Sequence, residues 1–317
     1  MKQRSILVTG ACGQLGTELV AALRQRHRAQ VVIATDVQRR EGVQPEDLYY
    51  ELNVLDQREL ERLVRCFNVK EIYHLAAVLS AKGEANPRAS WTLNMEGLFN
   101  VLEVTQKCKV GKIFWPSSIA VFGHNSHKAA CPQSSPTDPS TMYGVSKLAG
   151  EQVCKYYREK MGLDIRSIRY PGLVSHSAKA GGGTTDYAVD IFHEALSSGH
   201  YTCFLRENTG LPMMFMADAV RAAMLLMDAK RDELTVHTSY NLSGLNFTPK
   251  ELANEIRRHL PDFKISYSPD FRQQIADSWP SSVDDRQARH DWGWQPEYDL
   301  AKMVTEMINA LKQQEYA

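Results

Sequence analysis

Three glycines near the start of the chain restrict its possible folds more than any other feature of the sequence. Gly10, Gly13 and Gly16 follow a short apolar run at residues 6–9, and the leucines after them recur with helical spacing. Glycines at this spacing permit a tight turn and let backbone N–H groups approach an anion closely. An apolar run that enters a helix through such a turn is typical of a parallel α/β sheet whose first helix points its positive end at phosphate groups.

Strand and helix patterns alternate through the first half of the chain. Short apolar runs predict strands, and apolar residues at helical spacing between them predict helices. The expected strands cover residues 6–9, 31–35, 71–75, 112–116 and 164–169. This alternation predicts an α/β fold of the Rossmann type, in which a doubly wound parallel sheet carries helices on both faces.

The pattern loosens after residue 170, where helices are the main regular elements expected. They cover residues 186–198, 217–228, 249–259 and 300–313. We therefore expect residues 1–170 to form a nucleotide-binding domain. Residues 171–317 are expected to form mainly a smaller C-terminal substrate-binding lobe, with some of the later chain returning to the sheet.

The charge balance and the cysteines exclude several classes of partner. Lys plus Arg and Asp plus Glu each number 37, so nothing attracts nucleic acid. No apolar run reaches the roughly 18 residues that span a membrane, and the first strand pattern begins near Ser5, which leaves no room for a signal peptide. The six cysteines are at least 23 residues apart, without a C-x-x-C pair. We expect a cytoplasmic protein with reduced cysteines and no metal site.

A carboxylate at the end of the second strand indicates which dinucleotide the glycine turn binds. Asp36 follows the last glycine of the turn by 20 residues, and a carboxylate there accepts hydrogen bonds from the adenosine ribose and repels a 2′-phosphate. NAD is therefore favoured over NADP, although Arg39 and Arg40 could read the phosphate if they are not solvated loop charges. Asn53 and Asp56, just after the third strand, could hold the adenine edge, but both are also ordinary strand-end and helix-cap residues.

Tyr143 and Lys147 form a candidate acid/base pair. They are one helical turn apart on the same face, and an ammonium near a phenol favours the phenolate. Ser118 closes a strand 25 residues earlier, where its hydroxyl could hydrogen-bond a reacting oxygen. A tyrosine and a lysine at this spacing also occur by accident, so the surrounding motifs carry much of the weight.

Together these motifs resemble the extended branch of the short-chain dehydrogenase/reductase superfamily. Further matching pieces are residues 74–77 (His-Leu-Ala-Ala), Asn94, Ser117-Ser118 and residues 169–172 (Arg-Tyr-Pro-Gly). Asn94 could instead be an ordinary helix residue, and His74 a packed core histidine.

The resemblance implies a role for each matching position. Tyr143 is the implied acid/base, Lys147 lowers its pKa and binds the nicotinamide ribose, Ser118 is the catalytic hydroxyl, and Asn94 is the structural asparagine of the catalytic tetrad. The residues implied to bind NAD are Gly10, Cys12, Gly13, Gln14, Leu15, Gly16, Asp36, Asn53, Val54, Leu75, Ala76, Ala77, Tyr143, Lys147, Tyr170 and Leu173.

A narrower likeness, over roughly residues 5–310, is to the L-threonine 3-dehydrogenases of the short-chain type. It is carried by residues 79–84, 116–123, 181–188 and 277–294, of which the Gly-Gly-Gly-Thr-Thr-Asp-Tyr stretch is the most specific. The likeness implies oxidation of L-threonine at C3 to 2-amino-3-oxobutanoate, with hydride transfer to NAD+ and Tyr143 as the general base.

The same likeness implies a substrate site that contains Ser118 and Tyr143. Ser80 and Thr185 are the candidate hydroxyl donors for the substrate carboxylate, and Trp279 could close the pocket. Each has an ordinary alternative: Ser80 as a loop hydroxyl, Thr185 as a helix N-cap and Trp279 as a packing aromatic. The sequence identifies no group for the substrate ammonium.

Two other functions share most of these motifs. An NAD-dependent nucleotide-sugar epimerase or dehydratase of the same superfamily is the alternative enzyme, but a dehydratase is expected to carry an acidic residue beside the catalytic hydroxyl. Here Ile119, Ala120 and Val121 follow Ser118. A catalytically inactive NAD-sensing module is disfavoured by the intact Tyr143 and Lys147.

We also expect a homodimer. The helices near residues 93–105 and 145–157 lie where this superfamily commonly forms a four-helix bundle across a twofold axis. They carry extra apolar residues, such as Phe99, Tyr156 and Tyr157, and adjacent apolar helices satisfy the self-complementarity that a twofold interface needs.

Overall fold

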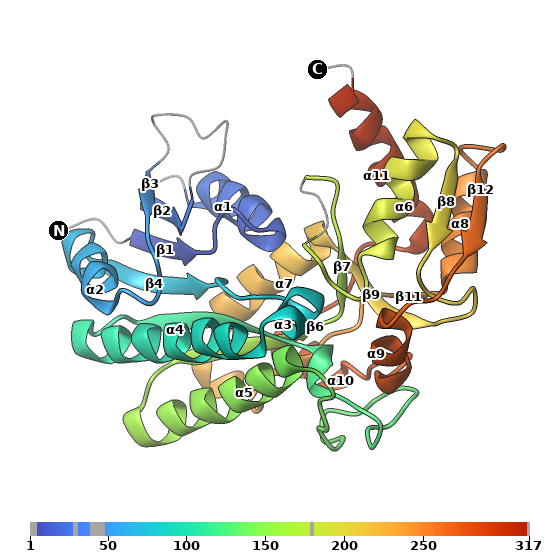
Figure 1. The fold of residues 1–317 in the computed structure, drawn as a ribbon. Coiled ribbons are helices and arrows are strands. Elements are labelled where there is room, and N and C mark those ends of the chain that lie inside the picture. The colour runs from blue at the N-terminus through green and yellow to red at the C-terminus, as the bar shows by residue number, and fades with distance from the viewer. Residues whose placement is uncertain (1–4, 28–30, 39–47, 178–180, 316–317) are drawn as a thin grey trace.

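The computed structural model describes residues 5–27, 31–38, 48–177 and 181–315. Its main sheet has seven parallel strands in the order β10-β6-β5-β4-β1-β2-β3 (Figure 1). The strands are β1 Ser5–Thr9, β2 Val31–Asp36, β3 Tyr49–Glu51, β4 Val69–His74, β5 Lys112–Ser118, β6 Ile165–Tyr170 and β10 Tyr240–Asn241. Each expected strand is present, with ends displaced by no more than two residues. The structure confirms the predicted Rossmann-type fold.

Helices cover both faces of this sheet. Successive side chains of a strand point to opposite faces, and here apolar side chains point to both of them. Ile6 and Val8 of β1 belong to a core with α1 (Gln14–Arg26) and α7 (Met216–Asp228). Leu7, between them, belongs to a second core with α2 (Gln57–Cys66), α4 (Pro87–Cys108) and α5 (Met142–Met161). β1 is therefore buried on both faces, as a central parallel strand should be.

The second half of the chain builds a lobe with a core of its own (Figure 1). Its strands are β7 Gly172–Val174, β8 His200–Cys203, β9 Leu211–Phe215, β11 Leu245–Phe247 and β12 Lys264–Tyr267, paired as β11-β9-β7 and β12-β8. Its helices are α6 Tyr187–Ser197, α8 Pro249–Arg257, α9 Arg272–Ser278 and α11 Leu300–Glu315. Between β9 and β11 the chain crosses back to the main sheet, where it supplies α7 and β10.

The remaining elements are short connectors. They are α3 Ser80–Ala85, α10 Arg286–Trp292 and the 3₁₀ turns η1 Ile119–Val121 and η2 Arg231–Glu233. Within the described ranges, no helix is both long and apolar enough to cross a bilayer. No group of three or more potential metal-binding side chains is found there either. All six cysteines are free.

The outer face of α4 and α5 is unusually apolar. Trp91 and Val145 are each 38% exposed and Tyr156 is 53% exposed. The ring of Phe99 lies 6.5 Å from that of Tyr157, and Tyr156 packs edge-on against the same ring. This face coincides with the surface on which the homodimer prediction rests.

We predict that Tyr156→Lys shifts the protein from dimer to monomer at micromolar concentration, because a charge would have to be buried at the twofold contact. Sedimentation of the variant and the unaltered protein would measure this. Phe271→Lys is the matched control, since Phe271 is 57% exposed and lies in the lobe. A monomeric mass for the unaltered protein would contradict the prediction.

Candidate active site

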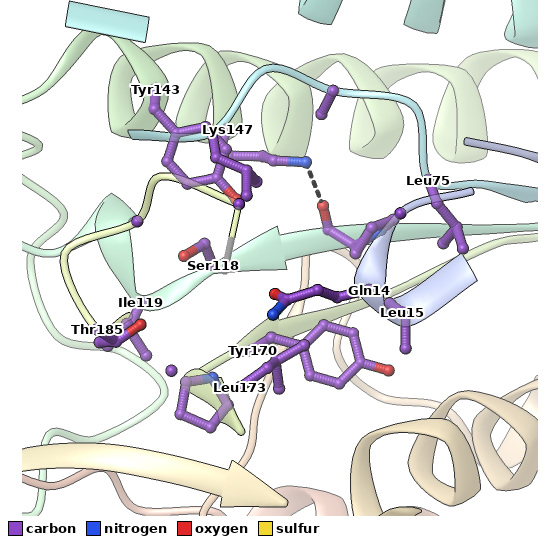
Figure 2. Close-up of a pocket in the computed structure, with 18 of the residues that line it drawn as sticks. Gln14, Leu15, Leu75, Ser118, Ile119, Tyr143, Lys147, Tyr170, Leu173 and Thr185 are labelled. Carbon is purple, nitrogen blue, oxygen red and sulfur yellow. Dashed lines mark hydrogen bonds between the residues drawn. The ribbon is translucent and has the colours of Figure 1, made fainter. Parts of the chain in front are cut away.

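A cavity of about 400 Å³ lies where the carboxyl ends of the central strands meet the lobe (Figure 2). The sheet side of the wall comes from the glycine turn, the ends of β4, β5 and β6, and the start of α5. The lobe supplies residues 181–186 and Trp279. Of the residues predicted for the site, the wall contains Gly10, Cys12, Gly13, Gln14, Leu15, Gly16, Leu75, Ala77, Ser118, Tyr143, Lys147, Tyr170, Leu173, Thr185 and Trp279.

The glycine turn can be formed only by glycine at two of its three positions. Gly10 has φ +71°, and a Cβ atom there would lie 2.6 Å from Ala76 N. A Cβ atom on Gly16 would lie 2.2 Å from the carbonyl oxygen of Gly10. At Gly13, the N-cap of α1, the nearest atom to a Cβ would be at 3.4 Å, and no side chain caps the helix. The first amides of α1 therefore remain available to an anion, as a dinucleotide pyrophosphate requires.

Asp36 links the end of β2 to the glycine turn. Its Oδ2 accepts a hydrogen bond of 2.9 Å from the backbone N–H of Cys12, and its Oδ1 accepts one of 2.8 Å from Val37 N–H. The carboxylate is thereby held beside the turn, at the place proposed for the ribose. Arg39 and Arg40 lie outside the described residues.

Besides Asp36, three predicted cofactor residues do not line the cavity: Asn53, Val54 and Ala76. Val54 is buried against Gly97: a Cβ atom added to Gly97 would lie 3.0 Å from Cγ2 of Val54. Asn53 accepts a hydrogen bond from Leu55 N–H through its own side chain, and Ala76 lies behind Gly10. Asp56, considered with Asn53, caps α2 by accepting from Glu59 N–H at 3.0 Å.

Close packing of α5 brings Tyr143 next to Ser118. A Cβ on Gly144 would lie 2.1 Å from the carbonyl oxygen of Ala120, and a Cβ on Gly150 would lie 2.5 Å from the ring of Trp115. The helix therefore lies directly on β5 and on the turn that follows Ser118. Figure 2 shows Tyr143 projecting from α5 toward Ser118 at the end of β5, whereas Lys147 extends along the hydrogen bond drawn to the Pro116 carbonyl.

The ionisable pair differs from the sequence-based expectation. Burial raises the pKa of Tyr143 to about 12, opposed by the neighbouring Ser118 hydroxyl, whereas we expected Lys147 to lower it. Burial lowers the pKa of Lys147 to about 8, and the neighbouring Cys154 and Glu151 oppose this shift. Lys147 does not lower the pKa of Tyr143 as expected, because its ammonium donates a 2.7 Å hydrogen bond to the carbonyl of Pro116 instead. The ammonium lies 5.6 Å from the centre of the phenol ring (Figure 2).

Asn94 supports the site from outside the cavity wall. Its amide accepts from Val78 N–H at 2.8 Å and donates to Ser146 Oγ at 3.0 Å. It therefore ties the segment after β4 to α5, one residue before Lys147. His74 is buried beneath the same region, with its Nδ1 2.8 Å from Thr9 Oγ1, and burial lowers the pKa of His74 to about 3. This is the environment of a neutral, packed core histidine.

Sequence reasoning missed a buried carboxylate one turn after Lys147. Glu151 has no exposed surface, accepts a 2.6 Å hydrogen bond from Ser117 Oγ, and forms a 2.7 Å ion pair with Arg169. Its spacing of four residues from Lys147, on the helix face that packs on β5, was the signal that could have identified it.

The lobe side of the wall contains the proposed substrate residues in part. Thr185 lies against the start of β7: a Cβ atom added to Gly172 would lie 2.7 Å from the Cβ of Thr185. It is not the N-cap of α6, because that position is Asp186. Trp279 is 6% exposed and follows α9. Ser80 begins α3, but its side chain lies outside the described part of the structure.

Several relatives resemble this chain over nearly its whole length. An uncharacterized epimerase/dehydratase of Staphylococcus saprophyticus is 44% identical over 317 residues, covering 99% of both chains. The holo form of a GalE-like L-threonine dehydrogenase from Cupriavidus necator is 48% identical, with a TM-score of 0.94 over 97% of this chain and 99% of that one. A monomeric L-threonine 3-dehydrogenase from a metagenome is 47% identical, with a TM-score of 0.94 over 98% of this chain and 99% of that one.

Residues 6–243 match the family described as the NAD dependent epimerase/dehydratase family. This match includes the glycine turn, the ends of the central strands and the start of α5. The chain belongs to that family, and its cofactor is NAD.

Proposed function

We propose that this protein is an NAD-dependent L-threonine 3-dehydrogenase, which oxidises the C3 hydroxyl of L-threonine to give 2-amino-3-oxobutanoate. The observation that carries the proposal is a single cavity in which Tyr143, Lys147 and Ser118 face Thr185 and Trp279 beside the glycine turn. The names of the solved relatives at 47–48% identity support the same substrate.

Different residues of the cavity would bind different parts of NAD. The amides of the glycine turn and of the first turn of α1 would hold the pyrophosphate, and Asp36 would accept from the adenosine ribose hydroxyls. Lys147 would bind the nicotinamide ribose. Gln14, whose buried Nε2 has no hydrogen-bond partner among the described residues, also lines this part of the cavity. Bound NAD+ supplies the hydride acceptor and a positive charge.

Tyr143 would take the proton of the C3 hydroxyl as the C3 hydride leaves, which converts the alcohol to a ketone. Ser118 would orient the hydroxyl oxygen. A phenol with a pKa of about 12 must be stabilised as phenolate by about 5 kcal/mol to act near pH 8. Lys147 can contribute part of this if its ammonium, which donates to the Pro116 carbonyl at 2.7 Å, moves from that carbonyl toward the phenol.

Thr185 and Ser80 would donate hydroxyl hydrogen bonds to the substrate carboxylate, and Trp279 would cover the bound amino acid. A small substrate enclosed between the sheet and the lobe would be shielded from water, which strengthens each of these polar contacts.

One assay separates this function from its alternative. NADH formation with L-threonine, set against conversion of UDP-sugars without net NADH formation, distinguishes a threonine dehydrogenase from a nucleotide-sugar epimerase. Ser118 is followed by three buried apolar residues, Ile119, Ala120 and Val121, and not by the acidic residue expected of a dehydratase.

Tyr143→Phe should lower turnover by about a hundredfold or more, the usual scale for losing a positioned acid/base. Because burial raises the pKa of Tyr143, the phenolate forms as pH increases. The turnover of the unaltered enzyme should therefore rise with pH, and the variant should lose that dependence. Steady-state rates across pH measure both, and NADH binding by fluorescence verifies the fold. Near-normal turnover of the variant would remove Tyr143 from the mechanism.

Asp36→Ser should weaken NAD binding and relax discrimination against NADP, because the repulsion of the 2′-phosphate disappears. The ratio of kcat/KM for the two cofactors measures this. Glu51→Gln is the matched control, since Glu51 is the register partner of Asp36 on the adjacent strand β3 and should leave the ratio unchanged. If the unaltered enzyme reduces both cofactors equally well, Asp36 does not select between them.

A further inference from the structure

The cavity contains one charged side chain that the proposed reaction does not use. Among the described residues of its wall, two side chains carry a full charge at neutral pH: Lys147, from α5 of the sheet domain, and Asp186, from the lobe. An amino-acid substrate brings one charge of each sign, and the sequence identified no group for its ammonium. We propose that Asp186, together with Thr184, binds the substrate ammonium. This inference rests on the proposed function.

Asp186 is held in place by the backbone of the glycine-rich loop. Its Oδ2 accepts hydrogen bonds of 2.7 Å from Gly182 N–H and 2.6 Å from Gly183 N–H. The residue also stands at the N-cap of α6, where the helix dipole favours a negative charge. Hydrogen bonds to a carboxylate favour its ionised form. A fixed anion therefore stands at the wall of the cavity, and it is only 9% exposed.

Thr184 provides an independent observation at the same place. Its side chain is 1% exposed, and its Oγ1 has no hydrogen-bond partner within the described part of the chain. A buried hydroxyl without a partner is costly. Since Thr184 lines the same cavity, a ligand with several N–H donors can satisfy it. A primary ammonium has three donors, and Asp186 and Thr184, two residues apart before α6, offer it a charged and a neutral acceptor.

The two walls then orient the substrate. The hydroxyl to be oxidised must reach Tyr143 and Ser118 on the sheet side, while the ammonium is held by the lobe. Thr185, between Thr184 and Asp186 in sequence, is the proposed donor to the carboxylate. The ammonium site therefore selects amino acids from among 3-hydroxy acids of the same carbon skeleton.

The test compares L-threonine with (R)-3-hydroxybutanoate, which has the same C3 configuration and lacks the amino group. In Asp186→Asn, the amide oxygen can still accept from the loop amides, so the change removes mainly the charge. We expect kcat/KM for threonine to fall about tenfold or more. Recognition of the hydroxy acid, as substrate or as competitive inhibitor, should not fall. Thr184→Val should lower the preference for threonine several-fold, and NADH binding should be retained in both variants.

Asp190→Asn is the matched control, because Asp190 lies one turn further along α6 and does not line the cavity. The Asp190→Asn variant should prefer L-threonine over (R)-3-hydroxybutanoate to the same extent as the unaltered enzyme. Equal losses for both ligands in Asp186→Asn would make Asp186 a structural clasp of the loop and overturn the inference. If that variant fails to bind NADH, an unchanged preference in Thr184→Val overturns it instead. The proposed function is tested separately, by the unaltered enzyme: if that enzyme does not oxidise threonine, the proposed function is refuted. The results with the variants bear only on the ammonium site.

Discussion

The buried ion pair between Glu151 and Arg169 is the interaction on which the geometry of the site depends. Glu151 is on α5, Arg169 is on β6, and both are nearly inaccessible to solvent at a separation of 2.7 Å. Ser117 on β5 donates to the same carboxylate, and Asn241 on β10 accepts from the guanidinium at 3.2 Å. Removing one partner of such a pair leaves a buried charge uncompensated, at a cost of about 3–5 kcal/mol. The carboxylate of Glu151 and the guanidinium of Arg169 together therefore join a helix to three strands.

The position of the reactive groups follows from that attachment. Tyr143 and Lys147 are two turns and one turn before Glu151 on α5, and Ser118 is the neighbour of Ser117. Fixing Glu151 against Ser117 therefore fixes the phenol of Tyr143 against the hydroxyl of Ser118. The glycines at 144 and 150 remove the side chains that would otherwise hold the helix away from β5. We infer that the ion pair fixes the position of α5 along the sheet, a role for which buried polar groups are retained in some proteins.

The cavity has two halves that come from different parts of the chain. The cofactor half consists of strand ends and a helix N-terminus, which the parallel sheet collects at one edge. The other half comes from a short segment after β7 and from the residue that follows α9. The face of α4 and α5 for which we predict a twofold contact belongs to neither half. A solved relative described as monomeric shows that this fold does not require a partner subunit.

The local sequence determined the fold and much of the candidate site. Gly10, Gly16, Asp36 and the pair Tyr143/Lys147 stand at fixed spacings from strands or helices, so one-dimensional periodicity was sufficient to place them. The short strands β3 and β10 lacked predicted bounds, because two or three residues carry no periodic signal. The pairing of Glu151 with Arg169 and Ser117 joins residues 18 and 34 positions apart, and only the packed sheet decides such contacts.

The electrostatics of the site also belong to the tertiary structure. The spacing of Tyr143 and Lys147 predicted a lowered phenol pKa, but burial acts on both groups and the Pro116 carbonyl takes the ammonium. The sequence by itself determined which residues are present and on which local element each lies. The tertiary structure decided which of them share one desolvated cavity, because desolvation and long-range contacts depend on how the chain packs in three dimensions.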